Sequence, residues 1–337
     1  MTNKERWESI LKRNELPDDR LPVIEWSIWW DATVRRWENE GMPTGLSSQD
    51  IHKYFNLDEH QQFMVGALSP SCPQPQGYGL GRIKTAEDYI KIKKYLYPEQ
   101  NINQYIEAAK EIVSRENKNK CPVSLLVHGF FWHPRELLGI EGHLYAFYDR
   151  PELIHEINSD LLKYNKRAID IICDIITPDL LCLYEDMSYK TGSMISKEIF
   201  DGFLAPYYKQ LIPYANKKGM NVFIDTDGNL EGLVPWYEEV GVDGVTPLER
   251  RAGVDIVKLL DLYPKLHAIS GFDKMTMSIG EEFMRAEFER ILPAMKTGRY
   301  IVSVDHQTPP EVSVDNYRIY LRLFEEYSIK AVSQWQI

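Results

Sequence analysis

The chain has 337 residues, with 39 Lys and Arg against 50 Asp and Glu, which gives a formal charge of −11. Hydrophobic residues make up 44% and aromatic residues 12% of the chain, so it can build a large core. This composition excludes disordered, collagen-like and coiled-coil chains. The acidic balance and the lack of runs rich in Lys and Arg argue against nucleic acid as a partner.

The first residues are charged and lack the apolar segment of a signal peptide, and no stretch of about 18 apolar residues occurs. We therefore expect a cytoplasmic protein that does not enter a membrane. The cysteines form no CxxC pair, and we expect them to be reduced and mostly buried. They are Cys72, Cys121, Cys173 and Cys182.

Short β-branched runs alternate along the chain with longer amphipathic stretches, which is typical of βα units around a parallel sheet. Eight runs are predicted to be strands, and the first two have the weakest pattern. They span residues 21–26, 62–67, 123–128, 180–185, 221–225, 241–246, 266–270 and 300–304.

Three helices between these strands are well defined. Residues 152–176 place Ile and Leu at spacings of three and four, as one buried face requires. Ser196 is a suitable N-cap for a helix over 196–218, and Ser278 begins an S-x-x-E capping box before the last strand. The pattern predicts an α/β fold, a (β/α)8 TIM barrel with an N-terminal extension, as one domain over 1–337. An open doubly wound sheet is the alternative, but no GxGxxG or Walker sequence follows a strand.

Acidic residues and histidines stand at the carboxyl end of nearly every predicted strand. In a barrel these ends meet in one cleft, where crowded carboxylates bind a metal or hold protons with raised pKa values. Each residue alone could instead cap a helix or a turn. The set comprises Glu25, His128, Glu185, Asp186, Asp225, Asp227, Glu249, Asp273, Asp305 and His306.

Asp225 and Asp227 occupy alternate positions, so on a strand both carboxylates would face the same side as a proton relay or a metal pair. Asp227-Gly-Asn is also strong turn sequence, which is the competing interpretation. His306 stands at a strand mouth, where imidazole can ligate a metal or transfer a proton, and a structural role is the alternative.

Two aromatic clusters could form walls of the cleft. Residues 128–133 read His-Gly-Phe-Phe-Trp-His, and residues 29–37 contain three tryptophans and Arg36. The rings suit a planar or apolar ligand, and the arginine could pair with a substrate carboxylate. Aromatic packing alone would explain the same pattern.

Nearly the whole chain resembles the uroporphyrinogen decarboxylase superfamily, in particular its bacterial decarboxylase-like proteins and corrinoid-linked methyltransferases. The resemblance implies a (β/α)8 barrel with its active site at the carboxyl ends of the strands. The segments that carry it are 30–37 (Trp-Asp-Ala-Thr-Val-Arg-Arg-Trp), 40–43, 129–132, 135–141, 185–192 (Glu-Asp-Met-Ser-Tyr-Lys-Thr-Gly), 206–208, 244–249, 252–255, 305–306 and 309–310.

This sequence departs from both activities of that superfamily. The decarboxylases carry Arg-Gln-Ala-Gly-Arg near the N-terminus, where residues 28–36 here read Ile-Trp-Trp-Asp-Ala-Thr-Val-Arg-Arg. The thiol-directed methyltransferases hold zinc with His-x-Cys-Gly, a Pro-x-Glu glutamate and a late cysteine. Those positions hold Asp225, Asp227, Glu249 and His306 here. Oxygen and nitrogen ligands in place of thiolates imply a harder divalent-metal site, with zinc as the first candidate, that polarises an oxygen.

The resemblance thus implies a methyltransferase that passes a methyl group from a small O-methyl compound, which could be aromatic, to a corrinoid carried by a partner protein. The expected catalytic residues are Glu185, Asp186, Asp227 and His306. The expected substrate-binding residues are Trp30, Arg36, His128, Trp132 and Tyr189. The alternatives are a metal-free decarboxylase of a porphyrinogen-like or smaller acid, and a non-enzymatic barrel that binds a corrinoid or porphyrin.

Overall fold

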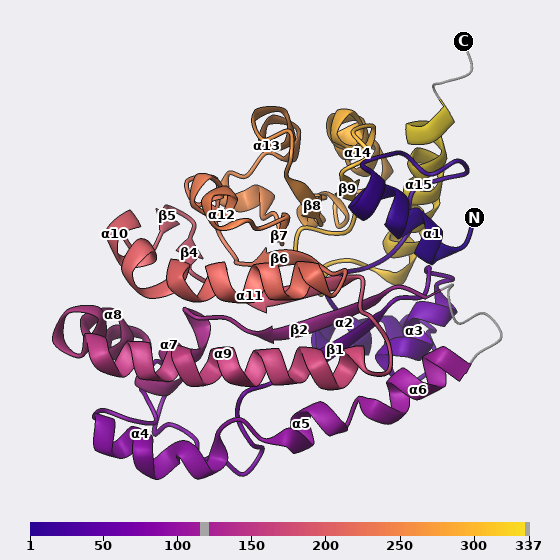
Figure 1. Cartoon of the computed structure of the whole chain (residues 1–337). Helices are drawn as coiled ribbons and strands as arrows, with labels where there is room; N and C mark the ends of the chain where they lie inside the picture. Colours follow the sequence, from indigo (N-terminus) through magenta and orange to yellow (C-terminus); the bar gives the residue numbers. More distant parts are fainter. Residues whose placement is uncertain (115–120, 334–337) are drawn as a thin grey trace.

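The computed structural model describes residues 1–114 and 121–333, and it contains a curled sheet of seven parallel strands with helices packed around it (Figure 1). The strands follow one another in sequence order, as in a TIM barrel, so the predicted α/β barrel class is confirmed. They are β1 (Gln61–Val65), β2 (Val123–His128), β3 (Leu180–Tyr184), β6 (Asn221–Asp225), β7 (Gly244–Thr246), β8 (His267–Ile269) and β9 (Tyr300–Ile301).

The central strands are apolar on both faces because helices cover one face and the barrel interior covers the other. Across the sheet Val127 pairs with Leu183, and Leu183 pairs with Ile224. All three side chains are fully buried. The parallel register brings the carboxyl ends of β2, β3 and β6 to the same edge of the sheet.

Residues 21–26, which we call the closing segment, are not a strand, and the prediction of a first strand there is wrong. The segment nevertheless lies between β9 and β1, where an eighth strand would lie. The Trp26 amide donates to Ser303 Oγ (2.9 Å), and Gln62 Nε2 donates to the Trp26 carbonyl (3.0 Å). Ser303 Oγ also donates to the buried Glu25 carboxylate (2.7 Å). Hydrogen bonds that involve side chains thus join the closing segment to its neighbours, in place of the backbone hydrogen bonds of a strand.

Long helices follow most strands. Figure 1 shows α9 and α11 lying along the sheet, with α4 and α5 beyond α9. The helices are α1 (Asn3–Glu8), α2 (Asp31–Asn39), α3 (Ser48–Tyr54), α4 (Ala86–Ile92), α5 (Glu99–Asn103), α6 (Ile106–Ser114), α7 (Trp132–Leu138), α8 (Ile140–Asp149), α9 (Pro151–Cys173), α10 (Lys197–Ile199), α11 (Ala205–Lys217), α12 (Val234–Val240), α13 (Ile256–Leu262), α14 (Glu281–Met295) and α15 (Val314–Val332). A small hairpin of β4 (Ser188–Tyr189) and β5 (Gly192–Ser193) follows β3.

Two of the three helix predictions are confirmed, although α9 ends at Cys173, three residues before the predicted end. The first is α9, and the second begins at its Ser196 cap and runs through a π-helical turn over Phe200–Leu204 into α11. The third helix, α14, exists, but its predicted capping box does not form. Ser278 Oγ donates to the Met275 carbonyl instead (3.3 Å), because Gly280, with φ of +136°, separates the serine from the helix.

Within the described part of the chain, no helix combines the length and the apolar character needed to cross a bilayer. Cys72, Cys121 and Cys182 are buried, as expected, and Cys173 is half-buried.

Candidate active site

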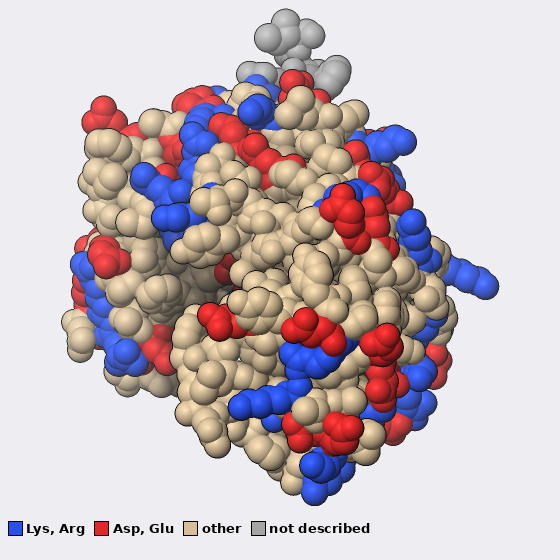
Figure 2. Space-filling model, turned by 90° about the vertical axis from the view of Figure 1, so that its left-hand side faces the viewer, with Lys and Arg blue, Asp and Glu red and all other residues tan. Residues whose placement is uncertain are grey.

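A pocket of about 550 Å³ lies at the carboxyl ends of the strands, where the barrel fold predicts it. Figure 2 views this end of the molecule and shows a hollow with acidic atoms inside its edge. One part of the lining is ionisable: His128, Glu136, Asp186, Asp225, Asp227 and His306. Much of the rest is apolar: Trp26, Ile28, Met64, Leu126, Trp132 and Pro247.

Asp225 ends strand β6, and Asp227 follows it with the same orientation. Both carboxylates line the pocket, as strand alternation predicts. Thr226 between them points away and is buried, and its Oγ1 accepts hydrogen bonds from the amides of Met187 (2.9 Å) and Ser188 (3.1 Å). The β4 hairpin therefore fixes the backbone from which the two acids project.

The carboxylates are crowded enough to hold protons. Burial, with the nearby charges of Asp227 and Asp186, raises the pKa of Asp225 well above its usual range. Burial also raises the pKa of Asp227 to about 6, with Asp186 and Glu249 adding to the shift and His306 opposing it. Burial and the neighbouring acids therefore favour the protonated form of Asp225.

His306 lies beside Asp227, with 3.6 Å between its Nε2 and the carboxylate Oδ1. Both side chains are partly exposed, so the pair stands in contact with solvent. Asp305 before it is fully buried and has a structural role, because it accepts from the Arg250 amide (3.1 Å) and pairs with Lys274 (3.1 Å).

Glu249 is hydrogen-bonded to the turn that follows Asp227. Its Oε2 accepts from the Gly228 amide (2.8 Å), and its Oε1 lies 3.9 Å from the Lys274 ammonium. The expected metal centre of Asp225, Asp227, Glu249 and His306 stays a prediction. Over the described ranges, those four do not supply three ligand atoms within 4.8 Å of one another.

Glu185 does not line the pocket, contrary to the expected placement. It is fully buried and accepts hydrogen bonds from the amides of Phe130 (2.8 Å), Phe131 (2.6 Å) and Trp132 (3.2 Å), and from the Tyr208 hydroxyl. The carboxylate thus accepts the hydrogen bonds of backbone amides at the start of helix α7, which have no partner within the helix. Burial raises its pKa to about 7, although all these donors oppose the shift. Asp186, the next residue, reaches the pocket instead, from a backbone with φ of +49°.

The expected substrate-binding residues divide into two groups. His128 and Trp132 line the pocket. Trp30 and Tyr189 are exposed and lie outside the lining, because they belong to the starts of α2 and of the β4 hairpin. Arg36 is paired with Glu40 (2.7 Å) and donates to the carbonyl of Pro310, so it is held on the surface.

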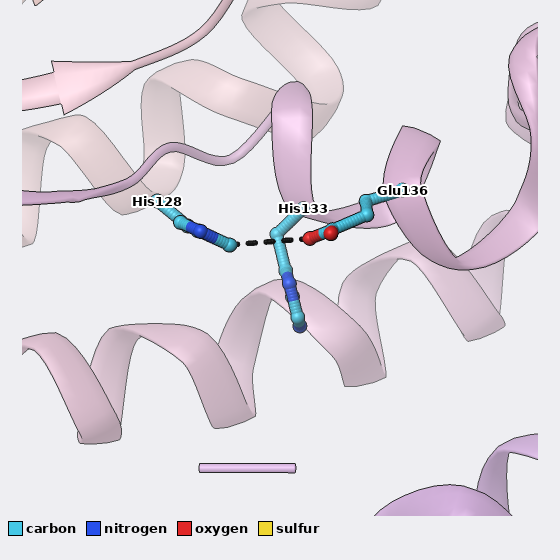
Figure 3. Close-up of side chains that lie close together, drawn as sticks. All are labelled: His128, His133 and Glu136. Carbon is cyan, nitrogen blue, oxygen red and sulfur yellow. Dashed lines mark ion pairs between the residues drawn. The ribbon is translucent and has the colours of Figure 1, made fainter. Parts of the chain in front are cut away.

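One group of residues was missed by the sequence reasoning. His128, His133 and Glu136 bring one ligand atom each to within 4.8 Å of one another, and they are the one such group of three in the described chain (Figure 3). Burial lowers the pKa of His128 to about 4 and holds the pKa of His133 well below its usual range, which favours neutral rings. The i, i+3 spacing of His133 and Glu136 on α7, just after a strand-end histidine, was a signal that could have revealed it.

Comparison with known proteins agrees with this fold. Residues 80–327 match the family described as uroporphyrinogen decarboxylase (URO-D), so the chain belongs to that family of barrel enzymes. A uroporphyrinogen decarboxylase of Campylobacter lari is 25% identical over 194 residues, which cover 54% of this chain and 52% of that protein. The match thus spans about half the length of that relative.

A solved methyltransferase from Methanosarcina mazei has the same fold. It superposes with a TM-score of 0.64 over 97% of this chain and 99% of its own, at 14% identity. At that identity the likeness establishes the fold and not the reaction. The family resemblance predicted from the sequence is confirmed, and the single-domain assignment over 1–337 stays a prediction.

Proposed function

We propose that this protein is a methyltransferase that moves a methyl group from a small O-methylated compound to a corrinoid carried by a partner protein. The observation that supports this choice within the family is the charge of the pocket. Among the described residues its lining holds three aspartates and one glutamate but no Lys or Arg. A porphyrinogen that carries several carboxylates would find no cationic side chain in this lining to pair with them. A neutral or cationic methylated compound does not need such a partner.

The pocket acids would supply the proton that such a reaction needs. When the bond between the methyl carbon and the substrate oxygen breaks, the oxygen keeps the bonding electron pair. A carboxylic acid that retains its proton near neutral pH can then protonate it and release an alcohol or phenol. Asp225 and Asp227 are suited to this step because burial raises the pKa of each, and the charges of neighbouring acids add to both shifts. His306 could return the proton to Asp227 from solvent.

The wall of the pocket suits a planar partner at its mouth. Ile28 and Met64 both line the pocket and are both about half exposed, which leaves apolar surface accessible from outside. The volume of about 550 Å³ is that of a small-molecule site. A reduced corrinoid delivered by its carrier protein would supply the nucleophile that accepts the methyl group. Trp132, held by Arg135 at 5.2 Å over its ring, would contact the substrate.

The test presents the protein with reduced corrinoid protein and a panel of methyl ethers, and follows methylcobalamin by its absorption. Asp225→Asn and Asp227→Asn should each slow the transfer about 10²- to 10⁴-fold, the usual contribution of a general acid. Asp174→Asn, at an exposed position after α9, is the matched control and should transfer at the wild-type rate. If no ether reacts and the protein instead releases carbon dioxide from a porphyrinogen or a smaller acid, the proposal is wrong and the decarboxylase alternative holds.

A further inference from the structure

We propose that His128, His133 and Glu136 bind one divalent transition-metal ion in the wall of the pocket. The resemblance implied a metal, but on four other residues, and nothing about the substrate enters this inference. It therefore stands or falls separately from the proposed methyl transfer.

The three side chains come from a strand end and the helix that follows it. His128 ends β2, and His133 and Glu136 lie one turn apart on α7. Figure 3 shows His128 and Glu136 pointing toward one another, with the ring of His133 directed to one side of the line that joins them. Their ligand atoms all lie within 4.8 Å of one another, a spacing that a single ion between them can bridge.

The polar atoms that face this space lack partners. Nδ1 of His128, Nδ1 of His133 and Oε2 of Glu136 are each buried without a hydrogen bond in the described structure, and His133 is fully buried. His128 Nδ1 and Glu136 Oε2 lie 3.4 Å apart. Three buried polar atoms without hydrogen bonds in one small space are costly, and a cation held by the two Nδ1 lone pairs and the carboxylate would satisfy all of them.

Neighbouring groups orient the ligands. The Tyr97 hydroxyl, itself bonded to Tyr89 (2.9 Å), lies 3.3 Å from His133 Nε2. With Nε2 protonated toward that oxygen, Nδ1 keeps its lone pair for a metal. Arg82 lies 3.8 Å from Oε1 of Glu136, which leaves Oε2 for the ion. The guanidinium charge also opposes a cation, so this site should be weaker than one without it.

Two imidazoles and one carboxylate with an open coordination position are the donor set of catalytic zinc sites. His128 and Glu136 both line the pocket, so the open position would face the substrate space. The ligand expected there is the oxygen of a water molecule or of a small substrate.

The first experiment titrates the full-length protein, freed of metal with a chelator, with Co²⁺ and with Zn²⁺. Co²⁺ is followed by its visible absorption, and Zn²⁺ by competition with a chromophoric chelator. We expect one equivalent of either ion per chain. Absence of bound Co²⁺ and Zn²⁺ above the level of a buffer blank would overturn the proposal.

Variants then test which residues hold the ion. Glu136→Gln and His133→Asn should each weaken Zn²⁺ affinity by at least about 10-fold, and Tyr97→Phe by about 10-fold. His306→Asn and Asp227→Asn are the matched controls, because they alter the ligands that the resemblance implied, and they should bind Zn²⁺ as the wild type does. Far-ultraviolet circular dichroism establishes that each variant is folded. Since Glu136 is partly exposed, its isosteric change keeps the test informative even if His133→Asn does not fold. Loss of Zn²⁺ in the two controls, or its retention in Glu136→Gln, would refute the assignment.

Discussion

Replacing Glu185 by Gln separates a structural role for this carboxylate from a catalytic one. The change keeps the shape of the side chain and removes a charge that is fully buried. The carboxylate now accepts hydrogen bonds from the backbone amides of Phe130, Phe131 and Trp132. In the variant, the side-chain NH₂ group of Gln would face at least one of these N–H groups, and two donors cannot bond to each other. One buried donor would then lack a partner, which costs about 1–3 kcal/mol at any pH.

The wild type carries a different cost, and this cost depends on pH. In the folded protein the pKa of Glu185 is raised from 4.5 to about 7, which at about 1.4 kcal/mol per pH unit corresponds to about 3 kcal/mol. Below pH 4.5 both states are protonated and the cost is absent. Between pH 4.5 and 7 the unfolded state ionises first, so stability falls as pH rises, and above pH 7 the full cost remains.

The measurement is the free energy of unfolding in urea at pH 5 and at pH 8, for the wild type and for Glu185→Gln. The advantage of the wild type over the variant should shrink by about 2 to 3 kcal/mol between the two pH values. Glu141→Gln, at an exposed site in α8, controls for loss of a surface charge. Equal pH dependence in wild type and Glu185→Gln would refute the reasoning. A loss of methyl transfer of 100-fold or more in the folded variant would restore Glu185 to the catalytic residues.

Three further outcomes are expected. The rate of methyl transfer should fall about tenfold per pH unit above about pH 6, where Asp227 loses its proton, and a pH–rate profile of Asp227→Asn should lack this limb. Gly129→Ala should lower the free energy of unfolding by about 1–3 kcal/mol in a urea titration, because its Cβ would lie 2.1 Å from Cδ of Glu185. Gly142→Ala, where the nearest atom is 3.9 Å away, is the control and should not destabilise the protein. Ser303→Ala removes the hydroxyl that joins the closing segment to the end of β9 and should cost about 1–3 kcal/mol by the same titration.

The strands were predictable because each depends on a local pattern, an apolar run bounded by turn residues. The closing segment has that pattern too, yet it forms no ladder, because β9 beside it is only two residues long. The length of a neighbouring strand that lies nearly 280 residues away in sequence is a property of the tertiary structure. A sequence pattern could place the segment in the barrel wall but could not show how it would be bonded there.

The same distinction explains the site. The shared orientation of Asp225 and Asp227 follows from strand geometry, which is local, and the structure agrees with it. The direction of the Glu185 side chain does not follow from strand geometry, because strand β3 ends at Tyr184 and the chain turns through the positive φ of Asp186. As a result, Glu185 accepts hydrogen bonds from the amides at the start of α7, and Asp186 faces the pocket. Asp186 belongs to a residue type that adopts the left-handed conformation more often than most, but this preference is too weak to predict the turn from the sequence.

The two proposals concern different side chains of one pocket, and this makes them separable. Because β3 alone stands between β2 and β6, the metal-binding group that follows β2 and the acids that follow β6 border the same small space. A proton donor and a metal ion can each stabilise a leaving oxygen, so activity alone cannot tell which one acts. The bound metal should be lost in Glu136→Gln and retained in Asp227→Asn. The decline of the rate above pH 6 should disappear in Asp227→Asn. If Asp227→Asn lost both the ion and the pH dependence, the acid would belong to the metal site after all, and the division of the pocket into a proton-donating wall and a metal-binding wall would be wrong.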